Sequence, residues 1–158
     1  MKYSILILVL VSCIIAQCTQ KEKEVKTEFS FAKQATPKGL KASETIDLEN
    51  KGVGPIQSVT ISEAINTEMA SSGAALYGQK CTPCHKLGTT FIGPPPNGIL
   101  ERRTPEWIMN MILNPEEMLQ KDALAQALFM EFNGQLMTNQ RLTKEEARAI
   151  LEYFRTLN

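Results

Sequence analysis

The sequence is poor in histidine and in aromatic residues. Among its 158 residues, His85 is the only histidine, Trp107 is the only tryptophan, and aromatic residues make up 6%. The 17 Lys and Arg residues balance 17 Asp and Glu residues, so the formal net charge is zero. The single histidine excludes any site that needs two imidazoles from one chain. The balanced charge argues against a nucleic-acid partner, which calls for a basic patch or stripe.

The sequence also lacks an apolar run of membrane-spanning length near its start. Residues 5–16 form an uncharged stretch of twelve residues, whereas a spanning helix needs about 20. This stretch follows Lys2 and suits the apolar core of an export signal. It resembles a bacterial lipoprotein signal, in which one cysteine is lipidated. Cys13 is favoured by the small residue before it, and Cys18 is favoured by its distance from the start of the chain, which suits the length of a signal peptide. Residues 1–18 are thus predicted to be a signal and lipoprotein segment of an exported, lipid-anchored periplasmic protein.

No segment alternates between apolar and polar residues over the length of a strand, so no sheet is predicted. Residues 19–61 are rich in Lys and Glu and are predicted to form a tether with a short extended lead-in. Residues 62–158 carry repeated helix-start signals. These are Ser62, Thr104 with Pro105, Asn114 with Pro115, Asp122, and Thr143 with Glu146. We therefore expect an all-α domain of four to five short helices over residues 62–158.

The chemistry of the chain centres on the sequence CTPCH, in which Cys81 and Cys84 are followed directly by His85. Four interpretations compete: a redox dithiol, a zinc site, a haem attachment site and a chance match. A structural zinc site needs four Cys or His ligands, and the chain offers only three outside the signal segment. A redox dithiol of the thioredoxin type accompanies a βαβ pattern, and the strands are missing. These points favour haem attachment.

Haem attachment explains each residue of the motif. The thiols of Cys81 and Cys84 form thioethers with the two vinyl groups of one haem c, and His85 becomes the proximal iron ligand. Because no second histidine exists, the distal ligand is expected to be a sulfur. The candidates are Met109, Met111, Met118, Met130 and Met137. We favour Met137, because it lies in a loop, while the others fall in helical patterns in which methionine usually fills the core.

Residues 62–158 resemble the small monohaem class I cytochromes c of bacteria. The stretch GAALYGQKCTPCHK resembles their first helix and haem site, and IGPPPNG resembles the Gly-Pro that follows. The resemblance implies that the Pro94 carbonyl accepts a hydrogen bond from His85 Nδ1–H, which fixes the ring. The stretch RRTPEWIMNMILNPEEM resembles the middle helix, where Trp107 would lie by a haem propionate with Arg102 or Arg103 as a further propionate partner.

The stretch GQLMTNQRLTKEEARAILEYFRTL resembles the methionine loop and the closing helix of these cytochromes. In that helix, Tyr153 or Phe154 would cross Gly73 and Tyr77 of the first helix. The chain departs from the family at Thr138, because the family usually has proline after the ligand methionine. Proline stiffens the loop, so Thr138 is expected to soften the iron–sulfur bond.

The resemblance implies electron transfer by a single haem iron between respiratory partners, with no enzymatic activity. A haem with both axial positions filled by protein has no open site for a substrate, and His/Met ligation raises the reduction potential. The run GVGPIQSV together with the middle-helix stretch resembles cytochromes associated with nitrous oxide respiration, which implies a nitrous oxide or other terminal reductase as a partner. Two alternatives stay open: a haem-based gas or redox sensor, and an accessory haem subunit of a reductase complex.

Overall fold

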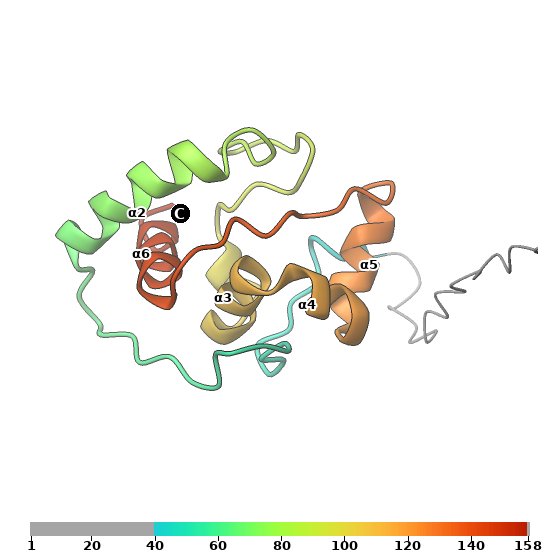
Figure 1. Ribbon diagram of the computed structural model, residues 1–158, viewed down its shortest axis with the longest axis horizontal. Coiled ribbons are helices and arrows are strands. Elements are labelled where there is room, and N and C mark those ends of the chain that lie inside the picture. Colours follow the sequence, from blue (N-terminus) through green and yellow to red (C-terminus); the bar gives the residue numbers. More distant parts are fainter. Residues whose placement is uncertain (1–39, 158) are drawn as a thin grey trace, which may run out of the picture. The chain divides into compact units, whose positions relative to one another are not determined.

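Five α-helices and one short 3-10 helix make up the secondary structure of residues 40–157, the part of the chain that the computed structural model describes. They are α2 (Thr67–Lys80), η1 (Ile99–Glu101), α3 (Pro105–Leu113), α4 (Pro115–Lys121), α5 (Ala123–Glu131) and α6 (Lys144–Phe154) (Figure 1). Within these residues there are isolated bridges but no strands, which confirms the all-α prediction. Residues 40–157 include no helix long and apolar enough to cross a membrane. The predicted signal segment, with Cys13 and Cys18, lies outside the described residues.

Most helices begin where the sequence predicts them, because the starting signals are local. The Thr104 hydroxyl accepts a hydrogen bond from the Trp107 N–H at 3.1 Å and Pro105 opens α3. The side chain of Asp122 accepts from the Ala125 N–H at 2.7 Å at the start of α5. At α6 both hydrogen bonds of the predicted capping box are present. Each cap satisfies N–H groups that the first helical turn leaves without partners.

The first helix differs from the prediction, because its N-cap is Asn66 and not Ser62. The Asn66 side chain accepts a hydrogen bond from the Met69 N–H at 2.9 Å, and its own backbone N–H donates to Glu152 at 2.8 Å. The Ser62 carbonyl instead accepts a hydrogen bond from Arg155 at 2.8 Å. These long-range contacts keep residues 62–65 out of the helix although Ser62 is a good capping residue.

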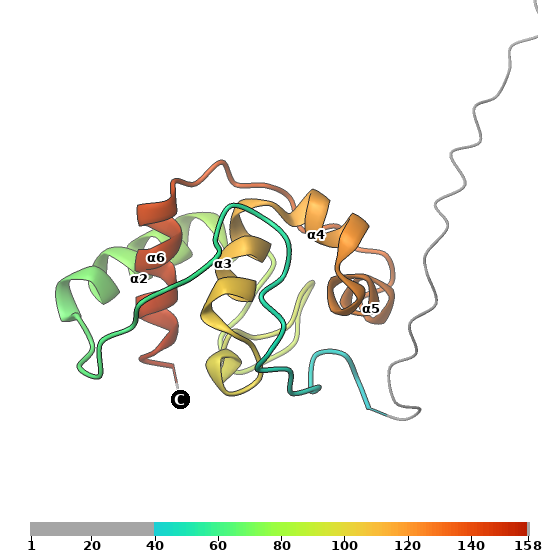
Figure 2. The same cartoon turned by 90° about the horizontal axis from the view of Figure 1, so that it is seen from below.

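Helices α2 and α6 cross each other closely and form the most extensive helix pairing in the described part of the chain (Figures 1 and 2). Gly73 of α2 lies at the crossing, and a Cβ atom there would come within 1.9 Å of the Ala149 carbonyl oxygen. One turn further along α2, the ring of Tyr77 packs against Tyr153 and Phe154, with centroid distances of 5.5 and 5.7 Å. The predicted contact between the first and last helices is thereby confirmed.

Residues 40–61, which we call the strap, pack along α5 and α3 before they reach the start of α2 (Figure 2). Ala42 and Ile56 of the strap are buried. Side chains of α3 and its N-cap hold the strap backbone: Thr104 Oγ1 donates to the Asn50 carbonyl at 2.6 Å, and Asn110 exchanges two hydrogen bonds of 2.9 Å with Ile56. The described part of the predicted tether is therefore packed against the helices. Its polar composition concealed this, because backbone groups and polar side chains such as Ser43 and Asn50 make many of the contacts.

Candidate functional site

The sequence CTPCH follows α2 directly, and its backbone N–H groups form a further turn at the end of the helix. The Cys81 N–H donates to the Tyr77 carbonyl at 2.9 Å, and the N–H groups of Cys84 and His85 donate to the Cys81 carbonyl at 3.0 and 2.9 Å. Cys81 is half-buried and Cys84 is exposed, and neither forms a disulfide. The motif therefore projects from a fixed helix end, with both thiols available for other bonds.

The imidazole of His85 is oriented by a single strong contact. Its Nδ1 lies 2.7 Å from the Pro94 carbonyl oxygen, which is the hydrogen bond that the sequence predicts. Because a carbonyl can only accept, Nδ1 carries the proton and the neutral ring has its lone pair on Nε2. The backbone of His85 is also held, since the Tyr77 hydroxyl donates to its carbonyl at 2.8 Å. These contacts leave Nε2 as the atom available to bind a metal.

Gly93 gives the imidazole the space it occupies. A Cβ atom at this position would lie 2.4 Å from Cε1 and 2.8 Å from Nδ1 of His85. The backbone of Gly93 is fixed as well, because its N–H donates to the Cys84 carbonyl at 3.0 Å. A side chain at position 93 would therefore push the ring away from the Pro94 carbonyl.

We expect Gly93→Ala to displace His85 and to lower the yield of haem-loaded protein. Overpacking of this kind costs about 1–3 kcal/mol, and haem absorbance per chain together with denaturant unfolding measures both effects. Gly78→Ala is the matched control, because a Cβ atom at position 78 would have no neighbour within 4 Å. Equal haem loading in the two variants would contradict the role given to Gly93.

The ionisation of Cys81 argues against a redox dithiol. Burial, and then the nearby charge of Cys84, raise the pKa of Cys81 to about 11. The reactive form of cysteine is the thiolate, so Cys81 is a weak nucleophile at neutral pH. Burial, followed by the charges of Cys81 and Tyr153, raises the pKa of Tyr77 to about 12 and keeps its hydroxyl a donor. Residues 40–157 also bring no three His, Cys, Asp or Glu side chains together as a metal site.

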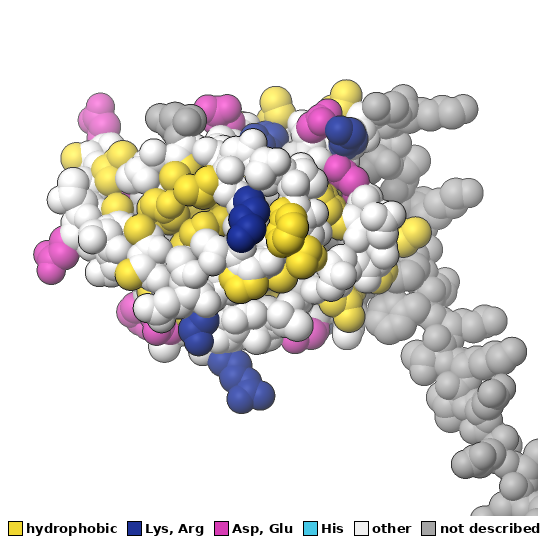
Figure 3. Space-filling view, turned by 90° about the horizontal axis from the view of Figure 1, so that it is seen from above, with side chains coloured by type: hydrophobic (Ala, Val, Ile, Leu, Met, Phe, Trp, Pro, Cys, Tyr) yellow, Lys and Arg dark blue, Asp and Glu magenta, His cyan; other side chains and the backbone are white. Residues whose placement is uncertain are grey.

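The same residues fit a haem. The free thiols can form two thioethers, and the oriented Nε2 can bind the iron. The loop that carries the motif exposes large apolar side chains, with Leu87, Phe91 and Ile92 exposed by 47%, 56% and 39%. Figure 3 views the molecule from the side of this loop, the upper side in Figure 1, and shows hydrophobic side chains gathered on that face. An apolar surface beside thiols and an imidazole suits a macrocycle better than a hydrated ion.

Met137 lies in the loop between α5 and α6, half-buried, and packs against the core. Three of the other candidate methionines differ from Met137 in their burial. Met109 and Met118 are 3% and 0% exposed, and the Met118 sulfur already accepts a hydrogen bond from the Val53 N–H at 3.0 Å. Met130 lies on α5 with 66% of its surface exposed. Met111 on α3 is half-buried and packs against the core as Met137 does, so Met137 as the distal ligand stays a prediction that rests on its place in a loop.

The polar atoms of Trp107 and Arg103, predicted to contact a haem propionate, are engaged with protein groups instead. The Trp107 indole N–H donates to Asp122 at 3.1 Å, and the side chain is 2% exposed. The Arg103 guanidinium is 3% exposed, donates to the carbonyls of Ala42 and Thr45, and lies over the indole ring at 5.3 Å. The structure thus assigns both side chains to the packing of the strap and of α5.

Arg102 is the remaining cation of the predicted propionate site. It is half-buried, and its Nη2 donates to the Asn97 carbonyl at 3.0 Å. Asn97 in turn accepts a hydrogen bond from the Gly88 N–H at 2.7 Å. Arg102 is therefore linked to the loop that follows His85, and its contact with a haem propionate stays a prediction.

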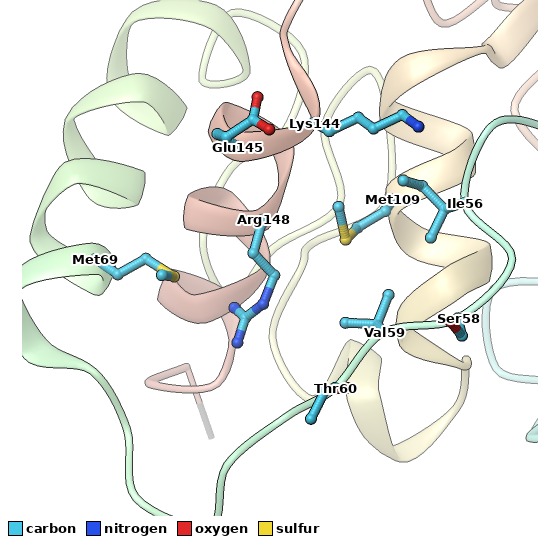
Figure 4. Close-up of a pocket in the computed structure, with 9 residues that line it drawn as sticks. All are labelled: Ile56, Ser58, Val59, Thr60, Met69, Met109, Lys144, Glu145 and Arg148. Carbon is cyan, nitrogen blue, oxygen red and sulfur yellow. The ribbon is translucent and has the colours of Figure 1, made fainter.

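A separate open cleft of about 360 Å³ lies between the strap, α2, α3 and α6. In Figure 4, Met69 of α2 and Met109 of α3 are among its lining residues, and Lys144, Glu145 and Arg148 reach it from α6. Its lining includes no cysteine or histidine. This cleft is therefore distinct from the site built around His85.

Sequence reasoning missed two parts of the site. It treated Tyr77 as core packing alone, because helical periodicity places a residue on a face but does not identify the partner of its hydroxyl. It also gave no specific role to Gly93, although a glycine directly before Pro94 in the loop after CTPCH was a usable signal. Both residues act on His85 through contacts that form only when the loop folds back on α2.

Comparisons with known proteins agree with this site. The family model for cytochrome c matches residues 70–158. A solved cytochrome c from Rhodothermus marinus is 41% identical, with a TM-score of 0.64, over 66% of this chain and 89% of that chain. An engineered form of it, Rma TDE, is 40% identical with a TM-score of 0.64 over 66% and 90% of the two chains. The same engineered protein bound to a carbene intermediate is 39% identical, with a TM-score of 0.61, over 66% and 89%.

No curated protein matches. The family match covers more than half of the chain and includes the whole of CTPCH, the loop with Pro94 and the methionine loop. The fold, the free thiols and the oriented imidazole support the same assignment. The chain therefore belongs to the cytochrome c family as a class I monohaem protein, and it carries a covalently bound haem c that transfers electrons.

Proposed function

We propose that this cytochrome c shuttles single electrons between two redox proteins on the periplasmic side of a membrane, to which a lipid anchors it. The observation that carries the proposal is the contact between His85 Nδ1 and the Pro94 carbonyl. It fixes the tautomer and direction of an imidazole that directly follows two free cysteines. A ligand held in this way changes little when an electron enters or leaves, which suits electron transfer.

The chain would supply the attachment points and the iron ligands, and a bound haem c would supply the one-electron chemistry. Cys81 and Cys84 would hold the haem by thioethers, and His85 Nε2 and the Met137 sulfur would bind the iron. Pro94 and Tyr77 hold His85 from its side chain and its backbone. With His85 and Met137 both bound to the iron, no position there would remain for a substrate, so we propose an electron carrier and not an enzyme.

The envelope location rests on the sequence of residues 1–18. Lipidation at Cys13 or Cys18 would give an anchor with several acyl chains, which holds a protein stably at a membrane where one chain does not. Covalent haem attachment outside the bacterial cytoplasm agrees with an exported chain. For the partners, the resemblance to cytochromes of nitrous oxide respiration favours a nitrous oxide or other terminal reductase. Its stable co-purification with the lipoprotein would indicate an accessory subunit in place of a free shuttle.

The proposal is tested by the spectrum of the exported holoprotein beside that of Met137→Ala. We expect the Met–iron charge-transfer band in the parent protein and its complete loss in the variant, because the sulfur is the distal ligand. Met130→Ala is the control, since this methionine is exposed on α5, and its band should be unchanged. A band that survives Met137→Ala would assign the ligand to another methionine. Ready binding of carbon monoxide by the reduced parent protein would favour a gas sensor.

A further inference from the structure

Residues 135–143, which carry Met137, are tied to the neighbouring helices through the side chain of Asn139. Within residues 136–142, the amide group of Asn139 makes the hydrogen bonds that reach other elements of the described chain. Its Nδ2 donates to the Leu113 carbonyl at 3.1 Å and lies 3.5 Å from Glu116 Oε2. Besides the packing of Met137 and Leu142 against the core, the side chain of Asn139 therefore holds this loop in place, and the loop backbone does not.

The acceptor of this hydrogen bond is a carbonyl at the end of a helix. Leu113 is the last residue of α3, and the last carbonyls of a helix have no partner within it. Pro115, two residues later, lacks an N–H and continues the chain into α4. Because α3 is largely buried, its end is a rigid point of attachment. Asn139 thus satisfies a free carbonyl and ties the loop to a helix that the core holds in place.

The oxygen atom of the same Asn139 amide stabilises the conformation of the loop. Asn139 Oδ1 accepts a hydrogen bond from the Arg141 N–H at 2.8 Å. Arg141 has φ of 55°, a left-handed conformation that residues with side chains rarely adopt. A side-chain acceptor two residues earlier stabilises such a turn. Both polar atoms of Asn139 are therefore used, one for the turn after Met137 and one for the link to α3.

We infer that Asn139 is a positioning residue for the distal ligand: it fixes the Met137 loop against the end of α3, so that the sulfur stays directed at the iron. This inference rests on the proposed function, in which Met137 is that ligand. It also explains how a chain with Thr138 in place of proline holds the loop. Proline would stiffen the backbone, whereas Asn139 fixes it by two hydrogen bonds.

The test measures how readily an external ligand replaces Met137 in the full holoprotein. Imidazole is titrated into the oxidised parent protein, Asn139→Ala and Asn139→Asp, while the Met–iron band is followed. Asn139→Ala removes both hydrogen bonds, and we expect imidazole to bind about three- to tenfold more tightly, as for the loss of one or two such bonds. Gln135→Ala is the control, because Gln135 is an exposed residue of the same loop, and it should bind imidazole like the parent.

Asn139→Asp separates the two contacts of the amide. Aspartate keeps the acceptor for the Arg141 N–H but cannot donate to Leu113, and it places a second carboxylate beside Glu116. If the link to α3 positions the loop, this variant should bind imidazole at least as tightly as Asn139→Ala. Parent-like affinity in Asn139→Asp would overturn the role of the Leu113 contact, and parent-like affinity in both variants would overturn the inference as a whole.

The outcomes also separate this inference from the proposed function. If Met137→Ala keeps the Met–iron band, Met137 is not the ligand, and both proposals fail. If Met137→Ala loses the band while the Asn139 variants bind imidazole like the parent, only the role of Asn139 fails. Thermal unfolding of each variant shows whether the fold is intact. A single cooperative unfolding transition, with a melting temperature lowered by only a few degrees for the lost hydrogen bonds, together with tighter imidazole binding is the expected result.

Discussion

Gly73→Ala is expected to destabilise the holoprotein by about 3 kcal/mol, at the upper end of the cost of overpacking. The added Cβ atom would lie 1.9 Å from the Ala149 carbonyl oxygen and 2.4 Å from its carbon. These are backbone atoms of α6, so no side-chain rotation relieves the clash. The two helices must separate, and the ring contacts of Tyr77 with Tyr153 and Phe154 would loosen as a consequence.

Gly78→Ala on the same helix is the matched control for this prediction. No atom lies within 4 Å of a Cβ atom at position 78, and alanine favours a helix over glycine by about 1 kcal/mol. Denaturant unfolding, followed by circular dichroism, should therefore show opposite changes in stability for Gly73→Ala and Gly78→Ala. Destabilisation of similar size in both variants would mean that α2 is sensitive to any substitution and that the crossing has no special part.

The second large loss of folding stability, about 3 kcal/mol, is expected for Glu152→Gln. Glu152 is fully buried and lies 2.6 Å from both Arg148 and Arg155, and it accepts the Asn66 N–H at the start of α2. Removing one partner of a buried ion pair leaves the remaining charges without compensation, which typically costs a few kcal/mol. Glutamine keeps the shape of the side chain and one acceptor oxygen, so the loss of stability results mainly from removing the negative charge.

The same carboxylate gives the protein a dependence on pH. Burial alone would raise the pKa of Glu152, but the hydrogen bonds from Asn66 and Arg148 and the charges of Arg148 and Arg155 outweigh it and lower the pKa below its ordinary value of 4.5. The folded protein therefore binds fewer protons at this group than the unfolded chain does. The stabilisation is present above pH 4.5 and is lost as the pH falls through the lowered pKa.

Unfolding measured across this acidic range should show a shallower loss of stability in Glu152→Gln than in the parent protein. Glu117→Gln provides the comparison, because hydrogen bonds from Lys121 and Asn114 and the charge of Lys121 also lower the pKa of Glu117. That ion pair is solvent-exposed, and exposed pairs contribute little to stability. We therefore expect Glu117→Gln to change the acid dependence of stability only slightly. If the stability of Glu152→Gln falls with acidity as it does in the parent protein, Glu152 is not the group that causes the loss of stability at low pH.

The parts of this protein that follow from its sequence are those fixed by neighbouring residues. Thr104 with Pro105 starts α3, because a cap and its acceptors lie within one turn. The sequence CTPCH identifies the haem site for the same reason: its chemistry depends on spacing along the chain. The contact between His85 and Pro94 was also predictable, but only through the family resemblance.

The parts that the sequence did not reveal depend on groups far apart along the chain. Serine often caps helices, yet α2 begins after Asn66 and not after Ser62. The reason is that Glu152 of α6 and Arg155, the C-cap of α6, bind the segment before α2. Trp107 was expected at a propionate, and its partner is instead Asp122, the N-cap of α5. Composition and periodicity describe which face of a helix is buried, and they do not tell which polar group a side chain will meet.

The strap determines how a mechanical load on the N-terminal side of the domain would be distributed. Tension applied at Leu40 would act first on the hydrogen bond between the Ala42 carbonyl and Arg103. It would act next on the hydrogen bonds of Ser43 to Glu131 at the end of α5, at 2.8 and 2.5 Å, and then on the bond between the Thr45 carbonyl and Arg103. Helix α2, which leads into Cys81, follows the strap in the chain and lies beyond these attachments. A pull on the N-terminal side of the domain would therefore act on α3 and α5, and the turn that carries Cys81 would keep its geometry.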